Sequence, residues 1–343
     1  MMNSSSRMAD EVQQIPEAVR RLLVEGAPEI RAAAAEARQR DPLFVATVAR
    51  GSSDHACTYL KYVVELMLGL PVASIGPSVA SIYGARLRMG RGLCLCVSQS
   101  GQSPDIVELA RVAREGGALT LALTNHPQSP LAAACDRTLA IRAGAELSVA
   151  ATKTFVTSAV AGLALVAEWQ QDADLRRALA LLPERLAEAA ALDWAELRET
   201  LAGATTLFTL GRGPAFAISN EAALKFKETC QIHAESYSSA EVLHGPVAIV
   251  ETGFPVLAFA AGDAAEAGVA EIADRLAGKG AEVFVTSPRA TAARVLPAVR
   301  TGHGLTDPLA LIVSFYAMVE RLARARGIDP DVPRHLRKVT ETV

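Results

Sequence analysis

The chain has 343 residues, a formal net charge of −3, and a composition that is 50% hydrophobic but only 5% aromatic. This length suits two ordinary domains or one large α/β unit, and the abundance of Ala, Leu and Val favours helices packed on parallel sheets. No Lys/Arg tract is long enough to predict nucleic-acid binding. No uninterrupted apolar run reaches about 18 residues and the start lacks a signal-peptide core, so we expect a cytoplasmic protein without membrane contact.

The hydrophobic pattern predicts a helical lead-in over residues 10–40, followed by strands that alternate with helices. The predicted strands of the first half cover residues 43–49, 72–75, 93–97, 119–123 and 138–141. The predicted helices between them cover residues 56–68, 78–88 and 104–115. A largely apolar helix (152–171) and a charged, alanine-rich helical connector (172–203) follow. This alternation favours a doubly wound parallel sheet.

The pattern then begins again, with strands predicted over residues 205–210, 254–260 and 283–286. Arg50-Gly51 recurs as Arg212-Gly213, 162 residues later, and Gly117-Ala118 recurs as Gly280-Ala281, 163 residues later. Two unrelated landmarks at nearly the same spacing predict a duplicated α/β unit.

The five cysteines are odd in number and include no CxxC pair, which predicts free, reduced thiols and no metal site. They are Cys57, Cys94, Cys96, Cys135 and Cys230. Cys94 and Cys96 alternate along a predicted strand, so both should face the same side as small buried hydrophobes.

The segment SQSGQS, Ser98 to Ser103, follows a predicted buried strand and precedes a predicted helix. Hydroxyls, backbone N–H groups and the positive helix end would meet there, which suits a phosphate; a simple turn with an N-cap is the alternative. Because the loop lacks the GK[ST] ending of a P-loop, it favours a monophosphate. The second copy reads AAGDAAEAG from Ala260 and lacks these serines, so it is free to supply other groups to a shared cleft.

In the second half, Glu221, Lys225 and Glu228 share one face of a predicted helix. A solvated Glu–Lys pair is one interpretation; the apolar neighbours favour a ligand-facing helix. The segment after Gln231 is predicted to be a polar loop that carries His244. Nearby, Gly211 and Gly213 resemble the start of a dinucleotide fingerprint, but Phe216 stands where the third glycine belongs, so no nicotinamide cofactor is expected.

Several motifs together resemble the sugar isomerase (SIS) superfamily, in particular the tandem-SIS isomerase half of glutamine–fructose-6-phosphate aminotransferase. They are GSS (51–53), SQSGQS (98–103), SVAATKTF (148–155), EAALKFKE (221–228), HAESY (233–237), AEVLHGP (240–246) and PRHLRKVT (333–340). The resemblance runs from about residue 43 to 342. It implies two tandem SIS domains, each a five-stranded parallel sheet flanked by helices in a flavodoxin-like arrangement. The implied organisation is a lead-in (1–40), domain 1 (41–175), a connector (176–202), domain 2 (203–326) and an active-site tail (327–343).

The resemblance also implies roles for individual residues, and no cofactor. It places a phosphate cradle at Ser53, Ser98, Gln99, Ser100 and Ser103, and sugar contacts at Ala150, Thr152 and Glu221. It makes Glu228 the base that moves a proton between C1 and C2, and Lys225 a group near the reacting carbonyl. His244 would assist ring opening from the neighbouring subunit, which implies a homodimer. By composition alone the tail is a surface arm with a solvated Lys338; the resemblance instead makes Lys338 the lysine that closes over the open-chain sugar.

The aminotransferase carries a glutaminase domain whose nucleophilic cysteine directly follows the initiator Met, whereas position 2 here is Met. Without that domain, we expect no ammonia supply from glutamine. The chain therefore resembles the second type of glucosamine-6-phosphate deaminase, which releases ammonia and fructose 6-phosphate. Alternatives are a fructosamine-phosphate deglycase, another phosphosugar isomerase or aminotransferase-like enzyme, and a non-catalytic sugar-phosphate-binding regulator.

Overall fold

The computed structural model describes residues 5–338, which divide into two units. The first unit comprises residues 17–146, 153–180 and 337–338, and the second comprises residues 5–16, 147–152 and 181–336. The domain boundaries given above stay a prediction.

The helices and strands alternate along most of the chain. The helices are α1 (Arg7–Gln13), α2 (Ile15–Glu25), α3 (Ala27–Arg40), α4 (Ser52–Leu68), α5 (Ser78–Ser81), α6 (Pro104–Glu115), α7 (Pro130–Ala134), α8 (Lys153–Gln170), α9 (Ala173–Ala190), α10 (Ala195–Leu201), α11 (Pro214–Cys230), α12 (Glu266–Ala277) and α13 (Asp307–Ala325), with 3-10 helices η1 (Glu241–His244) and η2 (Pro246–Ile249). The strands are β1 (Phe44–Val48), β2 (Val72–Ser74), β3 (Gly92–Val97), β4 (Leu119–Thr124), β5 (Arg137–Ala140), β6 (Thr206–Gly211), β7 (His233–Ser238), β8 (Pro255–Phe259), β9 (Glu282–Val285) and β10 (Arg294–Val295). None of the described helices is both long and apolar enough to cross a membrane.

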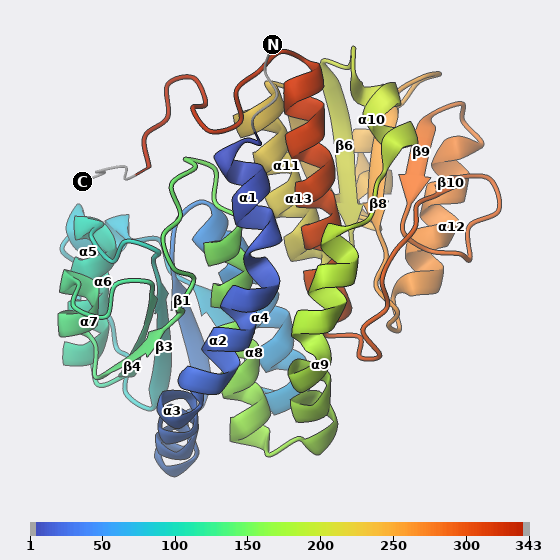
Figure 1. The fold of residues 1–343 in the computed structure, drawn as a ribbon. Coiled ribbons are helices and arrows are strands. Elements are labelled where there is room, and N and C mark those ends of the chain that lie inside the picture. The colour runs from blue at the N-terminus through green and yellow to red at the C-terminus, as the bar shows by residue number, and fades with distance from the viewer. Residues whose placement is uncertain (1–4, 339–343) are drawn as a thin grey trace. The chain divides into compact units, whose positions relative to one another are not determined.

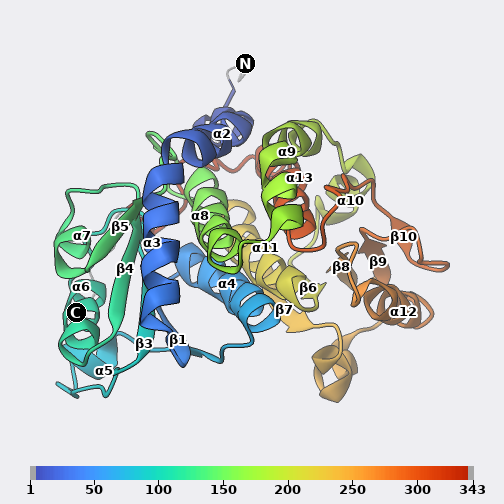
Figure 2. The ribbon, with the colours of Figure 1, turned by 90° about the horizontal axis from the view of Figure 1, so that it is seen from below.

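The first unit is built on a parallel five-stranded sheet with the order β2-β1-β3-β4-β5. Helices α3, α4 and α8 cover one face, while α5, α6 and α7 cover the other (Figure 2). Every residue of β3 and β4 is buried, because helices cover both faces of these central strands. This coverage explains why β3 reads as a continuous apolar run and why the residues of β4 other than Thr120 and Thr124 are apolar.

The second unit repeats this architecture, with a parallel sheet in the order β10-β9-β8-β6-β7. Helices α11 and α13 lie on one face and α12 lies on the other (Figure 1). Read from the opposite edge, the order is β7-β6-β8-β9-β10, so β6 corresponds to β1 and β8 to β3. Both sheets have the flavodoxin-like order, and the predicted duplication is confirmed.

The repeated Arg-Gly pair has the same local conformation in both units. Gly51 caps α4 with φ 55° and ψ −133°, and Gly213 caps α11 with φ 59° and ψ −140°. Residues that carry a side chain rarely adopt these positive φ values. Glycine is therefore needed where the first strand of each unit turns sharply into its helix.

Three local expectations differ from the structure. The helix expected over residues 78–88 ends at Ser81, because the chain turns at Gly84 (φ 59°) and leaves Ile82 and Tyr83 exposed. Helix α4 begins at Ser52 rather than near residue 56, so Ser53 lies in its first turn. The expected polar loop after Gln231 instead begins with β7, whose polar side chains suit a sheet edge.

The cysteines behave as small hydrophobes, as expected. All five thiols are buried and free of disulfides. Cys94 and Cys96 point to the same side of β3, with sulfur atoms 3.7 Å apart. Burial raises the pKa of Cys230 to about 12, so this thiol stays protonated at neutral pH.

Candidate active site

The serine-rich loop of the first unit leaves the carboxyl end of β3 and enters α6. The Ser98 hydroxyl accepts the N–H of Gly101, and the Ser100 hydroxyl accepts the N–H of Gln102, both at 3.2 Å. Gly101 has φ 61°, and a Cβ there would meet the Ser129 Oγ at 2.1 Å. Ser103 occupies the N-cap of α6, yet its side chain accepts no capping hydrogen bond from the helix. The N-cap interpretation therefore does not account for its hydroxyl.

Ser53 lies at the same sheet edge, because β1 is the parallel neighbour of β3 and α4 begins just beyond β1. Arg50 joins the two strand ends: its Nε and Nη2 lie 2.6 and 2.5 Å from Oδ2 of buried Asp105, the second residue of α6. Burial raises the pKa of Asp54, and the neighbouring His55 and Arg50 side chains oppose that rise. The first unit thus gathers serine hydroxyls, two helix N-termini and the ion-paired Arg50 at the carboxyl ends of its strands.

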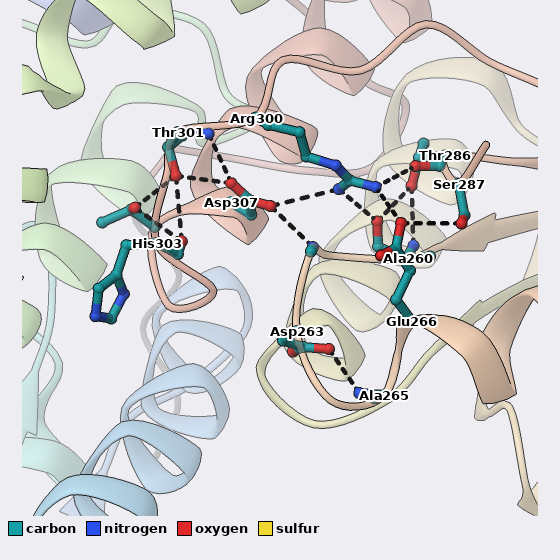
Figure 3. A network of polar contacts seen from close by, with 12 residues as sticks. Ala260, Asp263, Ala265, Glu266, Thr286, Ser287, Arg300, Thr301, His303 and Asp307 are labelled. Carbon is teal, nitrogen blue, oxygen red and sulfur yellow. Dashed lines mark hydrogen bonds and ion pairs between the residues drawn. The ribbon is translucent and has the colours of Figure 1, made fainter. Parts of the chain in front are cut away.

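The corresponding edge of the second unit is closed by a network of polar side chains (Figure 3). Arg300 donates to the carbonyls of Ala260 and Thr286, at 2.9 and 3.0 Å. Its guanidinium also lies 2.7 Å from Glu266 and 3.4 Å from Asp307. Where the first unit has a serine loop, the second has an arginine already paired with two carboxylates.

Helix α11 carries a buried group of three charged side chains, which we call the α11 triad: Glu221, Lys225 and Glu228. Nζ of Lys225 lies 3.2 Å from Oε1 of Glu221 and forms a shorter contact with Oε2 of Glu228. The side chains of Glu221 and Lys225 are fully buried, whereas that of Glu228 is 18% exposed. The interpretation as a solvated pair is therefore wrong.

The electrostatics of the α11 triad favour a charged lysine. Burial by itself lowers the pKa of Lys225, but the negative charges and hydrogen bonds of Glu221 and Glu228 outweigh burial and raise it. The site therefore holds one positive charge between two carboxylates, of which only Glu228 reaches solvent.

His244 makes no described hydrogen bond or ion pair with the α11 triad. It ends η1 and is exposed.

The predicted sugar-contacting residues Ala150 and Thr152 lie buried in the segment 147–152 of the second unit. Glu11 of α1, itself 4% exposed, accepts the backbone N–H groups of Leu147 and Ser148. Helix α1, which the sequence analysis treats only as part of a lead-in, therefore holds the backbone of the segment 147–152 in place.

The tail lysine is not freely solvated. Nζ of Lys338 lies 2.8 Å from Oε2 of Glu146, whose side chain is fully buried. Glu146 also accepts the N–H of Thr154 at 3.1 Å and its hydroxyl at 2.7 Å, so it caps the start of α8. Both contacts lie within the first unit.

The structure thus brings Ser53 to the edge that bears the serine loop, and gathers Glu221, Lys225 and Glu228. Sequence reasoning missed Glu11, Arg50, Asp105 and Glu146. Two of them had a usable signal: Glu146 lies two residues before the SVAATKTF motif, and Arg50 belongs to the repeated Arg-Gly pair. Across residues 5–338, no three His, Cys, Asp or Glu side chains gather in a way that could hold a metal ion.

Two sheets of flavodoxin-like order, duplicated in one chain, define a tandem α/β protein. A model of the SIS domain matches residues 29–168 and 200–286, and the chain belongs to the SIS domain family. Among its relatives, the glutamine–fructose-6-phosphate aminotransferase of Symbiobacterium thermophilum is 37% identical over 315 residues, which cover 86% of this chain and 51% of that one. The enzyme of the same name from Aeropyrum pernix is 36% identical over 319 residues, covering 85% and 50%. The chain therefore spans about half the length of these relatives.

Solved structures agree on the fold. A "putative phosphosugar isomerase" from Silicibacter pomeroyi DSS-3 is 67% identical, with a TM-score of 0.93 over 95% of this chain and all of that one. Glucosamine-6-phosphate deaminase from Thermotoga maritima has a TM-score of 0.73 over 95% of this chain and all of that one. At 20% identity, the second comparison bears on the fold alone.

Proposed function

We propose that this chain is a phosphosugar isomerase of the deaminase type, which converts glucosamine 6-phosphate and water into fructose 6-phosphate and ammonia. One observation carries the proposal: Glu228 is a partly exposed carboxylate bonded to a buried lysine on a rigid helix. A carboxylate held in this way suits the transfer of a proton between adjacent carbons.

The proposed reaction begins on the open-chain sugar, whose C2 bears the amine and an acidic hydrogen. Glu228 takes the C2 proton while the C1 oxygen gains a proton from water, which gives an enolamine. Glu228 then returns its proton to C1 and the C2 nitrogen gives one up to water, so that C2 becomes an imine. Water then adds to C2 and the C–N bond breaks. Ammonia departs, and the product is fructose 6-phosphate with its ketone at C2. The Lys225 ammonium would stabilise negative charge that develops on the C1 oxygen.

The other predicted residues would bind and prepare the substrate. Ser53 and the serine loop would hold the phosphate, whose binding energy fixes the position of the distant carbons. His244 of a second copy would move the proton needed for ring opening, which its exposure permits. Lys338 would leave Glu146 to cover the open-chain sugar.

The test is to incubate the purified full chain with glucosamine 6-phosphate and measure ammonia and fructose 6-phosphate. We expect turnover by the wild type and a loss of about a thousandfold in kcat for Glu228→Gln, since positioned acid–base groups contribute roughly 10²–10⁴-fold. Glu235→Gln is the matched control, because this glutamate on neighbouring β7 is 45% exposed and lies outside the α11 triad.

Absence of turnover by the wild type on both glucosamine and galactosamine 6-phosphates would contradict the deaminase. Turnover of a fructosamine phosphate alone would favour the deglycase. Saturable binding of the sugar phosphates without any turnover would favour a regulator.

A further inference from the structure

Tyr316 of α13 connects a second helix to the α11 triad. Its hydroxyl donates to Oε1 of Glu221 at 3.1 Å, the same oxygen that lies 3.2 Å from Nζ of Lys225. Lys225 in turn bonds Glu228. Tyr316, Glu221 and Lys225 are all fully buried. A continuous chain of hydrogen bonds therefore runs from α13 to the one carboxylate of the triad that solvent reaches.

The two carboxylates compete for one ammonium. In a buried site, each donor that Glu221 receives satisfies part of its negative charge and weakens its hold on Lys225. The phenol of Tyr316 is such a donor, and it is neutral, so it adds no net charge to the site. Through this competition a side chain on α13 affects how much of the ammonium is available to Glu228.

Other charged groups on the elements packed against α11 are engaged elsewhere. On α13, Glu320 accepts from Ser6 and lies 3.9 Å from Arg324. On the same helix, Asp307 belongs to the Arg300 network, and Arg321 pairs with Asp193.

On β7, His233 lies 3.7 Å from Glu235, and the Tyr237 hydroxyl donates to Glu235. Strands β6 and β8, which also pack on α11, carry no charged residue. Tyr316 is thus the titratable side chain of a neighbouring element with a described hydrogen bond to the triad.

We propose that Tyr316 is a positioning residue that sets how Lys225 is shared between Glu221 and Glu228, and so how readily Glu228 accepts a proton. This inference rests on the proposed function and extends it to a residue that does not touch the substrate. The described path from Tyr316 to Glu228 runs through Glu221 and Lys225.

The direct test is Tyr316→Phe, which removes one hydroxyl from a buried ring. Without that donor, Glu221 attracts more of the ammonium and the carboxylate form of Glu228 loses part of its stabilisation. We expect the acidic limb of the kcat/KM profile to move to higher pH by roughly half to one unit, the effect of about one hydrogen bond, while kcat above that limb should stay within about twofold. The KM should stay within about twofold, because the phosphate-binding groups are untouched.

Two variants separate this role from a merely structural one. Ser314→Ala removes a buried hydroxyl from the same helix, one that donates to Ala189 O at 2.9 Å, and it should leave the profile in place. In a Glu221→Gln background, Tyr316→Phe should add no further shift, because its path to Glu228 is already broken. An equal shift with Ser314→Ala, or full additivity with Glu221→Gln, would overturn the proposal.

A measurement that needs no turnover separates this inference from the proposed function. The carboxyl carbons of ¹³C-glutamate-labelled protein are titrated by NMR, with the Glu228 signal assigned through Glu228→Gln. We expect its titration midpoint to move upward in Tyr316→Phe. If no sugar phosphate is turned over but the midpoint moves, the proposed reaction fails and the Tyr316 link stands. If the midpoints coincide, the link fails.

Discussion

The two units use one sheet architecture but end their third strands in different chemistry. After β3, the loop carries serine hydroxyls, and Ser103 at the N-cap of α6 makes no capping hydrogen bond. The charge of the nearby Arg50 is neutralised by Asp105. After β8, Arg300 is held by Glu266, Asp307 and two carbonyls. The difference teaches that a duplicated fold can leave hydroxyls and a helix N-terminus uncommitted after the third strand in one copy and use the same place for an internal ion-pair network in the other.

The largest test of this contrast is Arg300→Met. It leaves Asp307, whose side chain is 3% exposed, and Glu266, at 13%, without their shared cation. Because Arg300 itself is 32% exposed, we expect a loss of about 2–3 kcal/mol in the free energy of unfolding, below the roughly 3–5 kcal/mol of a fully buried pair. Urea unfolding measures it.

Arg289→Met is the control, since Arg289 is 63% exposed and lies 3.3 Å from the same Glu266. It should cost less than about 1 kcal/mol. An equal loss in both variants would show that the Arg300 network is not what holds this edge.

The serine loop should respond in the opposite way. Ser103→Ala removes a hydroxyl that makes no capping bond, so stability should change by less than about 1 kcal/mol. Affinity for fructose 6-phosphate should fall about tenfold, because a hydrogen bond to a charged phosphate contributes roughly 1.5–3 kcal/mol. Isothermal titration calorimetry measures the affinity, and Ser81→Ala on α5 is the matched control. Unchanged affinity together with a clear loss of stability would return Ser103 to a purely structural role.

The smallest expected effect concerns Asp274, which fixes the chain before β10. Slight burial raises the pKa of Asp274, but hydrogen bonds from Ala293, Ala292 and Thr291 outweigh it and lower the pKa to about 2. A carboxyl whose folded pKa is depressed stabilises the fold above its unfolded pKa near 4, and this stability is lost as pH falls through about 2.

Asp274→Asn should therefore cost about 1 kcal/mol at pH 7, a modest value because the group is only partly buried, and the cost should shrink between pH 5 and 2. Urea unfolding at several pH values measures this. Asp136, which directly precedes the edge strand β5, plays a similar part in the first unit. It accepts the backbone N–H of Thr120 at 2.9 Å and the Thr120 hydroxyl at 2.8 Å. A pH-independent difference between wild type and Asp274→Asn would contradict the assigned role of the carboxylate.

The central strands were predictable because both faces are buried and their residues form continuous apolar runs. Strand β7 was not, because its polar residues HAESYS lie at a sheet edge and follow no buried pattern. The helix expected over residues 78–88 failed for a different reason: the chain turns at Gly84 with φ 59°, so the helix ends at Ser81.

The sequence by itself determined the duplicated α/β fold, since hydrophobic period, turn glycines and repeat spacing are local signals that add along the chain. It also determined that Glu221, Lys225 and Glu228 share a helix face. Only the tertiary structure decided that Lys225 is buried between two carboxylates, that Tyr316 donates to one of them, and that Arg300 closes the second edge. These contacts join residues far apart in the chain, and burial, which makes an ionic contact strong, is a property of the packed core.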